Sequence, residues 1–215
     1  MFASSSLLSH YKKSEKKEFE DVVSKTGPRD YIQALANLGV ATFLLVLYQF
    51  IPSQVLIASL IGSVAAANAD SWASEIGGIS KKKPVLITTF KPVDKGISGG
   101  VTYPGTIGGI AGSLFIVCIG VIFLNLSTSF KGNMTFLFWA SFVAGSLGFI
   151  FDSYIGAVFQ SLYKNKTNER FTEDNEGNKE LVKGFSWINN DVVNFLTTLF
   201  AALLAGGIYY TLINF

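Results

Sequence analysis

The chain has 215 residues, of which 49% are hydrophobic and only 15% are charged, too little polar surface for a soluble domain of this length. The formal net charge is +2, and the charged residues lie between the apolar runs, which excludes a basic surface for nucleic acid. One histidine, His10, and one cysteine, Cys118, exclude an internal disulfide and effectively exclude a zinc site built on these ligands.

The first segment, MFASSSLL, is too short to cross a membrane and lacks the basic start and cleavage site of a secretory signal peptide. We expect it to be the tail of an earlier helix. On that interpretation the chain is an N-terminally shortened version of a longer protein, although a peripheral anchor would have a similar sequence.

Five apolar runs that follow are long enough to cross a bilayer as helices, which takes about 20 residues. They are residues 33–51, 55–77, 106–126, 135–163 and 191–213. The sequence therefore predicts an all-α, polytopic transmembrane helix bundle, with residues 1–215 forming a single membrane domain. Small residues of the fourth run recur every three or four positions, which predicts close packing against another helix through Ser141, Gly145, Gly148, Asp152 and Gly156.

The basic residues alternate from loop to loop. They cluster before the first run, in the loop 78–105 and in the loop 164–190, whereas the other side carries only Lys131. The positive-inside rule then places the N-terminal arm and both long loops in the cytoplasm and the C-terminus outside. By default we expect the cytoplasmic membrane of a prokaryote. In the second loop, residues 175–178 read as the turn of a small hairpin that caps this side.

Four carboxylates fall at the same membrane level, at the ends of these runs. They are Asp70, Glu75, Asp152 and Asp191, and we take them as candidate catalytic and metal-binding residues. Charged groups are costly in a membrane and tend to mark functional sites, and hard oxygen ligands suit magnesium. The alternative is that each is a helix-terminal residue that pairs with a loop lysine.

Hydroxyl and amide side chains surround these carboxylates in the sequence and are candidates for binding substrate. They are Asn68, Ser71, Ser153, Gln160, Asn190 and Asn194. The loop before the third run adds lysines, glycines and a hydroxyl next to a helix N-terminus, where an anion is favoured: Lys91, Lys95, Gly99, Gly100, Thr106 and Gly108. The motif is not a P-loop, and these glycines also fit a simple turn before a helix.

Several motifs together resemble those of the membrane family that contains plant phytyl-phosphate kinase and animal transmembrane protein 19. They are KTGPRDYIQALANLGV, NADSWASEIG, GGVTYPGTIGG, GSLGFIFDSYIGAVFQ and NNDVVN, which occur in the family's order and span nearly the whole chain. The family is distantly similar to nucleotide-dependent polyprenol and phytol kinases. Its members usually carry further membrane helices before the first of these motifs.

The resemblance implies transfer of a terminal phosphoryl group from CTP, GTP or ATP to an isoprenyl monophosphate, which gives the diphosphate. It also implies that Arg29 and Asn37 join the carboxylates and Asn190 as site residues. The implied partners are a lipid phosphate, a nucleoside triphosphate with magnesium, and membrane lipids. A homo-oligomer is compatible with these features.

Three other functions remain open on the sequence. A lipid cytidylyltransferase or phosphotransferase would keep the same site and change the reaction. A small membrane transporter would place its polar residues near the middle of the bilayer and show some symmetry between halves, and neither feature is evident. A structural membrane subunit would not explain why four carboxylates cluster at one membrane level.

Overall fold

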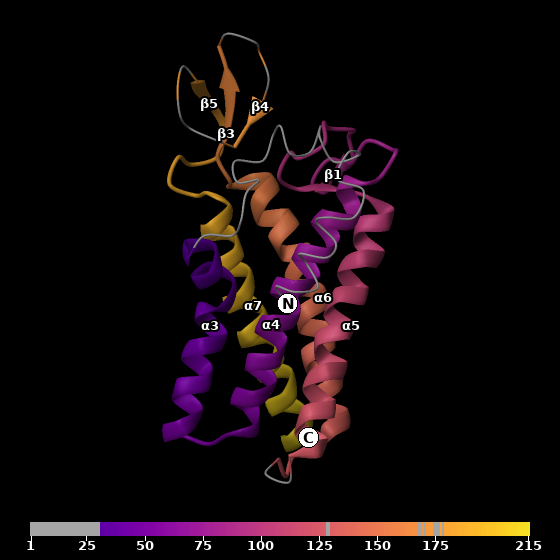
Figure 1. Cartoon of the computed structure of the whole chain (residues 1–215), viewed down its shortest axis with the longest axis vertical. Coiled ribbons are helices and arrows are strands. Elements are labelled where there is room, and N and C mark those ends of the chain that lie inside the picture. The colour runs from indigo at the N-terminus through magenta and orange to yellow at the C-terminus, as the bar shows by residue number, and fades with distance from the viewer. Residues whose placement is uncertain (1–30, 128–129, 167–168, 170, 174–176, 178) are drawn as a thin grey trace.

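The computed structural model describes residues 31–127, 130–166, 169, 171–173, 177 and 179–215. Five helices in this part of the chain are long and apolar enough to cross a membrane, which confirms the predicted helix bundle. They are α3 (Tyr31–Phe50), α4 (Gln54–Gly78), α5 (Tyr103–Leu126), α6 (Met134–Val158) and α7 (Asn190–Asn214). They run side by side, and successive helices of the chain run in opposite directions (Figure 1).

Each of the last four helices begins at a polar side chain that binds a free amide of the first turn. The side chains of Ser53, Thr102, Asn133 and Asn189 accept hydrogen bonds from the amides of residues 55, 105, 136 and 192. These caps satisfy first-turn amides that have no carbonyl partner within the helix. They also explain why α5 begins at residue 103, three residues before the apolar run of residues 106–126.

The α4 helix is the centre of the bundle and contacts each of the other four spans. Small residues permit this packing. A Cβ atom added at Gly62 would lie 2.5 Å from Cβ of Ala205 in α7, and one at Gly148 would lie 2.5 Å from Cβ of Ala66 in α4. The small face predicted for the fourth run therefore packs closely against α4, as expected for membrane helices that lack a strong hydrophobic driving force.

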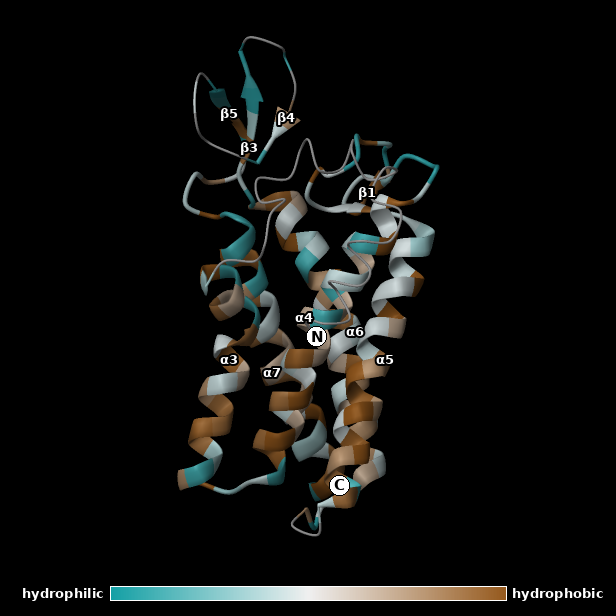
Figure 2. Cartoon of the chain, viewed as in Figure 1, coloured by the Kyte–Doolittle hydropathy of each residue, from teal (hydrophilic) through white to brown (hydrophobic). Residues whose placement is uncertain are grey.

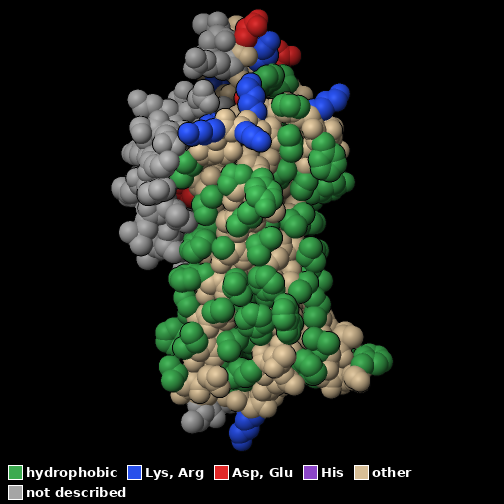
Figure 3. Space-filling view, turned by 90° about the vertical axis from the view of Figure 1, so that its right-hand side faces the viewer, with side chains coloured by type: hydrophobic (Ala, Val, Ile, Leu, Met, Phe, Trp, Pro, Cys, Tyr) green, Lys and Arg blue, Asp and Glu red, His purple; other side chains and the backbone are tan. Residues whose placement is uncertain are grey.

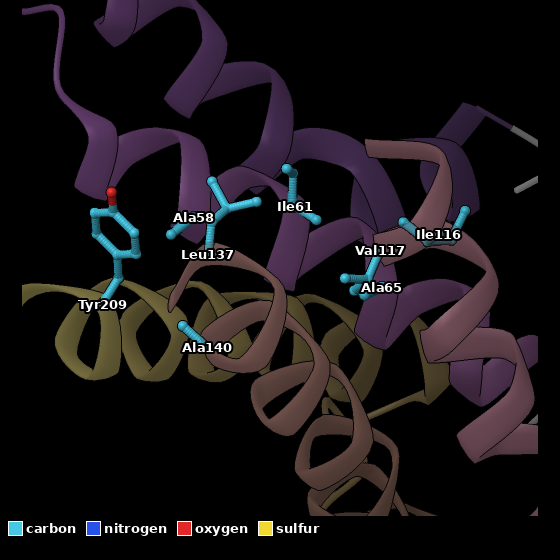
Figure 4. Close-up of a cluster of buried hydrophobic side chains, with 8 residues drawn as sticks. All are labelled: Ala58, Ile61, Ala65, Ile116, Val117, Leu137, Ala140 and Tyr209. Atoms are coloured by element: carbon cyan, nitrogen blue, oxygen red, sulfur yellow. The ribbon is translucent and has the colours of Figure 1, made fainter. Parts of the chain in front are cut away.

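A cluster of buried apolar side chains joins α4, α5, α6 and α7 (Figure 4). Its members are Ala58, Ile61, Ala65, Ile116, Val117, Leu137, Ala140 and Tyr209. Hydrophobic residues dominate the lower part of the bundle in Figure 2, whereas polar residues gather toward the end that carries the strands. In Figure 3 hydrophobic side chains cover the middle of the visible face, as a lipid-facing surface requires.

The strands of the described residues form two small sheets at one end of the bundle, and we call this end the sheet end. In the loop between α4 and α5, β1 (Val85–Leu86) pairs with β2 (Gly100–Val101). Between α6 and α7, β3 (Leu162–Asn165), β4 (Phe171–Thr172) and β5 (Lys179–Lys183) form an antiparallel sheet in the order β4-β3-β5. Helices α4 and α6 end here, and α3, α5 and α7 begin here (Figure 1).

The structure differs from the sequence prediction at the end of the fourth span. The helix ends at Val158, not at residue 163, and Leu162 and Tyr163 become buried residues of β3. The apolar side chains there pack in the sheet. The hydrophobic pattern of the sequence cannot distinguish them from one more turn of the helix. The two strands predicted to form a hairpin, β4 and β5, do not pair with each other; each pairs with β3, which lies between them in the sheet. Most of the predicted turn lies outside the described residues.

Candidate functional site

Three helices bring polar side chains together near the sheet end. Asp70 of α4 and Asp152 of α6 are half-buried, and their carboxyl groups are hydrogen-bonded to each other. The hydroxyl of Thr197 in α7 donates to Oδ2 of Asp152 at 2.8 Å. Two carboxyl groups that are hydrogen-bonded to each other require a proton or a cation between them. We call this arrangement the acidic pair.

The other two predicted carboxylates do not join the acidic pair in a metal-binding group. Among the described residues, no group of three or more His, Cys, Asp or Glu side chains could hold a metal ion. Glu75 lies more than one helical turn beyond Asp70 and is half-buried. Asp191 is buried in the first turn of α7, where the positive end of the helix dipole stabilises a negative charge.

Four of the predicted amide and hydroxyl groups bond to backbone carbonyls. Asn68 is fully buried, and its Nδ2 donates to the carbonyl of Gly112 in α5 at 2.9 Å, so it joins two helices. Asn37, Ser71 and Ser153 each donate to the carbonyl four residues earlier in their own helix. Asn190 begins α7 and Asn194 is buried one turn farther along. Arg29 lies outside the described residues.

The loop before α5 has less capacity for an anion than its sequence predicts. The amide of Gly105 donates to Oγ1 of Thr102, the amide and hydroxyl of Thr106 bond to the Thr102 carbonyl, and Pro104 has no N–H. Most donors of this helix N-terminus are therefore already used. Lys91 is exposed and Lys95 half-buried.

The glycines of this loop and of α5 have structural reasons for being glycine. Gly99 adopts a φ of +84° and packs directly against Ala157 of α6, so a side chain there would both strain the backbone and clash. Gly100 belongs to β2. At Gly108, a Cβ atom would lie 2.7 Å from the Ile76 side chain of α4, so close helix contact explains this position.

A second polar cluster contains one residue predicted from the sequence, Gln160, and three that were not predicted: Ser98, Glu173 and Lys183. The Ser98 hydroxyl donates to the Glu173 carboxylate, and Nζ of Lys183 donates to the carbonyl of Gly156 at 3.0 Å. Gln160 is 2% exposed and lies beside the same glycine. These contacts attach the three-stranded sheet and the α4–α5 loop to the end of α6. Glu173 and Lys183 stand in polar segments without periodicity, so no sequence signal separated them from solvated loop residues.

Burial shifts the pKa values of both titratable groups in this second cluster. It raises the pKa of Glu173 from 4.5 to about 7, against the effects of the Ser98 hydroxyl and the Lys183 charge, which lower it. Burial also lowers the pKa of Lys183, and the attraction of Glu173 acts in the opposite direction. Glu173 lies close enough to Asp152 for their charges to interact. The second cluster and the acidic pair are thus electrostatically connected.

The bundle and its polar end define a multi-pass integral membrane protein with an acidic pair between its spans. The chain belongs to the family described as integral membrane protein DUF92, whose model matches residues 1–202. It is similar to Protein PGR of Arabidopsis thaliana, with 28% identity over 94% of this chain and 77% of that protein.

Two further relatives extend the comparison. Protein VTE6, chloroplastic, of Arabidopsis thaliana is 32% identical over 90% of this chain and 52% of its own length. An uncharacterized membrane protein of Methanocaldococcus jannaschii is 33% identical over 71% of this chain and 51% of its own length. The chain thus spans about half of each of these two relatives. No solved structure matches it.

Proposed function

We propose that this protein is a nucleotide-dependent phosphotransferase that converts an isoprenyl, phytyl-like monophosphate to the diphosphate at the sheet end. The observation that carries the proposal is the acidic pair, Asp70 and Asp152, which lies between helices at that end and is held there by Thr197. The reaction class comes from the resemblance of the motifs around both carboxylates to the family of plant phytyl-phosphate kinase. The lipid chain would lie along the apolar spans, with its phosphate at the acidic pair.

Magnesium fits the acidic pair better than it fits four carboxylates. Proteins commonly hold Mg²⁺ with one or two carboxylates, while water and substrate phosphates complete the shell. Asp70 and Asp152 would hold the ion, which when bound neutralises charge on the phosphates. Thr197 would keep the Asp152 carboxylate oriented through its hydroxyl. Glu75 and Asp191 are not required as ligands in this arrangement.

In the proposed reaction, an oxygen of the lipid monophosphate forms a bond to the terminal phosphorus of CTP, GTP or ATP. The bond between that phosphorus and its bridging oxygen breaks, and the nucleoside diphosphate leaves with the electron pair. The monophosphate is already anionic at neutral pH, so no residue has to remove a proton. The task of the protein is then to position both phosphates and to stabilise their charge.

The first experiment compares Asp152→Asn with a matched control, Asp94→Asn, which alters an exposed carboxylate that pairs with Lys83 at 2.8 Å. Purified full chain in nanodiscs receives phytyl or other isoprenyl monophosphates, each nucleoside triphosphate and magnesium. We expect lipid diphosphate from the wild type and from Asp94→Asn. In Asp152→Asn the rate should fall by about 100-fold or more, the scale found when an electrostatic group is removed from an active site.

Product analysis separates the competing reactions. A nucleotidyl lipid would identify a cytidylyltransferase and reject the kinase. Well-folded wild type that forms no product with any nucleotide would also reject it. An Asp152→Asn variant as active as Asp94→Asn would move the site away from the acidic pair.

We also propose that the sheet end faces the cytoplasm and that the membrane is the plasma membrane of the cell. Exposed lysines support this orientation, because Lys81, Lys82 and Lys83 lie at the sheet end, whereas Lys131 lies at the other end. In a Cys118→Ser background, a membrane-impermeant maleimide added to intact cells should label Lys131→Cys and not Lys82→Cys. The reverse pattern would invert the proposed topology.

A further inference from the structure

Polar groups from three segments surround the last turn of α6 at Gly156. Nζ of Lys183, from β5, donates to the Gly156 carbonyl at 3.0 Å. A Cβ atom added at Gly156 would lie 3.3 Å from Cβ of Ser98, in the α4–α5 loop, and 3.4 Å from Oε1 of Gln160. The absence of a side chain at Gly156 allows these groups to approach the helix end.

Gln160 is the member of this group that packing does not explain. It is 2% exposed, yet its Nε2, which carries two N–H donors, has no hydrogen-bond partner. A buried donor without an acceptor costs about 1–3 kcal/mol, so such groups usually have a role that involves a ligand or an ordered water. Lys183 adds a second source of donors, since its ammonium group has three and the Gly156 carbonyl uses one.

These donors lie close to the acidic pair along α6. Asp152, Gly156 and Gln160 are spaced by four residues, and the first two lie on one face of α6. Because Lys183 and the Gln160 side chain both approach Gly156, their donors lie about one helical turn, roughly 5.4 Å, beyond Asp152 toward the sheet end. An anion bound by these donors would lie beside a cation held by the acidic pair.

We propose that Gln160 and Lys183 bind a phosphoryl oxygen of a substrate, next to the acidic pair. The proposal deepens the phosphotransferase function and, as regards the reaction, rests on it. The shared chemistry is a phosphate group, which the lipid monophosphate and the nucleotide both carry. Amide and ammonium donors recognise phosphate oxygens, and the carboxylates of the acidic pair, which lack donors when ionised, cannot do so without a cation.

Glu173 belongs to the same cluster and opposes an anion while it is ionised. Its carboxylate accepts from Ser98 and attracts Lys183. Phosphate would therefore compete with Glu173 for the Lys183 ammonium group. This competition predicts that Glu173→Gln binds phosphate more tightly than the wild type does.

The test uses full chain in nanodiscs with magnesium and radiolabelled inorganic pyrophosphate, a probe that requires no turnover. The variants are Gln160→Met and Lys183→Met, with Lys183→Arg as a rescue. Lys166→Met is the matched control, because Lys166 is exposed and pairs with Glu180 on the outside of the sheet. Gln160→Met should keep the wild-type unfolding temperature, since Nε2 has no protein partner to lose.

We expect the dissociation constant for pyrophosphate to rise about tenfold, or roughly 1.4 kcal/mol, in both Met variants. Lys183→Arg should recover part of the affinity, and Lys166→Met should match the wild type. In the turnover assay, KM should rise with little change in kcat. A rise in KM for the lipid monophosphate assigns the cluster to that substrate, and a rise in KM for the nucleotide assigns it to the nucleotide.

The outcomes separate this proposal from the kinase proposal. Wild type that binds pyrophosphate through Gln160 and Lys183 but transfers no phosphoryl group would reject the kinase and keep the phosphate site. An active wild type whose pyrophosphate affinity is unchanged in both Met variants would keep the kinase and overturn the phosphate site. Wild type that does not bind pyrophosphate would overturn the site as well.

Discussion

At Asp152, interactions from three parts of the chain converge. The carboxyl group contacts Asp70 of α4, accepts from Thr197 of α7 and lies within electrostatic range of Glu173, which follows β4. A half-buried carboxyl group with this many partners has a restricted orientation. Such restriction is required of a residue that binds a metal ion or a substrate, because misplacement by about 1 Å reduces activity strongly.

Thr197→Val tests this restriction. Valine keeps the shape of threonine and removes the 2.8 Å hydrogen bond to Asp152. We expect the lipid-phosphorylation rate to fall about tenfold, the effect of losing roughly 1.4 kcal/mol of hydrogen bonding to a charged group. Thr211→Val is the control, because the Thr211 hydroxyl bonds only within α7, to the Gly207 carbonyl, and is exposed. Equal rates in both variants would show that Asp152 does not need Thr197.

Glu173 makes the docking of the three-stranded sheet dependent on pH. Its pKa is raised by burial from 4.5 to about 7, so folding favours the protonated form. The stabilisation is complete below pH 4.5 and is lost as the pH rises through 7. The nearby charges are Lys183, which attracts the ionised carboxylate, and Asp152, which repels it.

We therefore expect the amides of β3 and β5 to exchange faster at pH 8 than at pH 5, after correction for the intrinsic effect of pH on exchange. Hydrogen-exchange mass spectrometry of the protein in nanodiscs measures this difference. Glu173→Gln should remove the pH dependence and keep the protection. If the wild type were equally protected at both pH values, the raised pKa of Glu173 would not contribute to docking.

The residues that the sequence identified and those that it missed differ in their surroundings. Asp70 and Asp152 stand in apolar helices, where a carboxylate is costly and therefore informative. Thr197 was missed because a threonine in a membrane helix usually bonds to its own backbone. Glu173 and Lys183 were missed because their burial depends on a sheet that brings distant segments together, and no local pattern records that contact.

At the scale of the elements, α4 is the helix whose small residues determine how closely the bundle packs. Gly62 faces α7, where an added Cβ atom would lie 2.5 Å from Cβ of Ala205 and 3.1 Å from the carbonyl of Ala201. The backbone of α7 cannot move away from such an atom without separating the helices. Space at this position is therefore more important than the helix propensity of the residue.

Gly62→Ala should destabilise the bundle by about 1–3 kcal/mol, the usual cost of overpacking. Gly207→Ala is the matched control, because nothing lies within 4 Å of its added Cβ atom. Alanine favours helix over glycine by about 1 kcal/mol, so the control should be unchanged or more stable. Thermal unfolding in detergent measures both. Equal stability of the two variants would contradict the packing described for α4 and α7.

The elements themselves were predictable where one physical signal dominated. The apolar length of each span predicted five helices, and the described part of the chain has five of that length and hydropathy. The end of α6 was not predictable, because Leu162 and Tyr163 continue the apolar pattern but pack in β3. The order β4-β3-β5 depends on that same unrecognised strand.

At the scale of the whole molecule, exposed aromatic side chains indicate where the bilayer surface meets the sheet end. Tyr31, Tyr103 and Trp187 lie at or just before the starts of α3, α5 and α7 and are 75%, 82% and 68% exposed. Aromatic residues of this kind concentrate at membrane interfaces. Thr197 lies seven residues beyond the first residue of α7, so the acidic pair lies about 10 Å below this level.

Fluorescence of single tryptophans tests that depth. With Trp72 and Trp139 replaced by Phe, Trp187 should be quenched most strongly by lipids brominated near the headgroup. In the control, with Trp72 and Trp187 replaced, Trp139 should be quenched by bromine nearer the bilayer centre, because it lies five residues inside α6 and is 53% exposed. A Trp187 that no brominated lipid quenches would place the interface nearer the acidic pair. Quenching of Trp187 by the lipid brominated near the headgroup would place Trp187 at the membrane interface. A phosphate would then have to pass below the headgroups, between the helices, to reach Asp70 and Asp152.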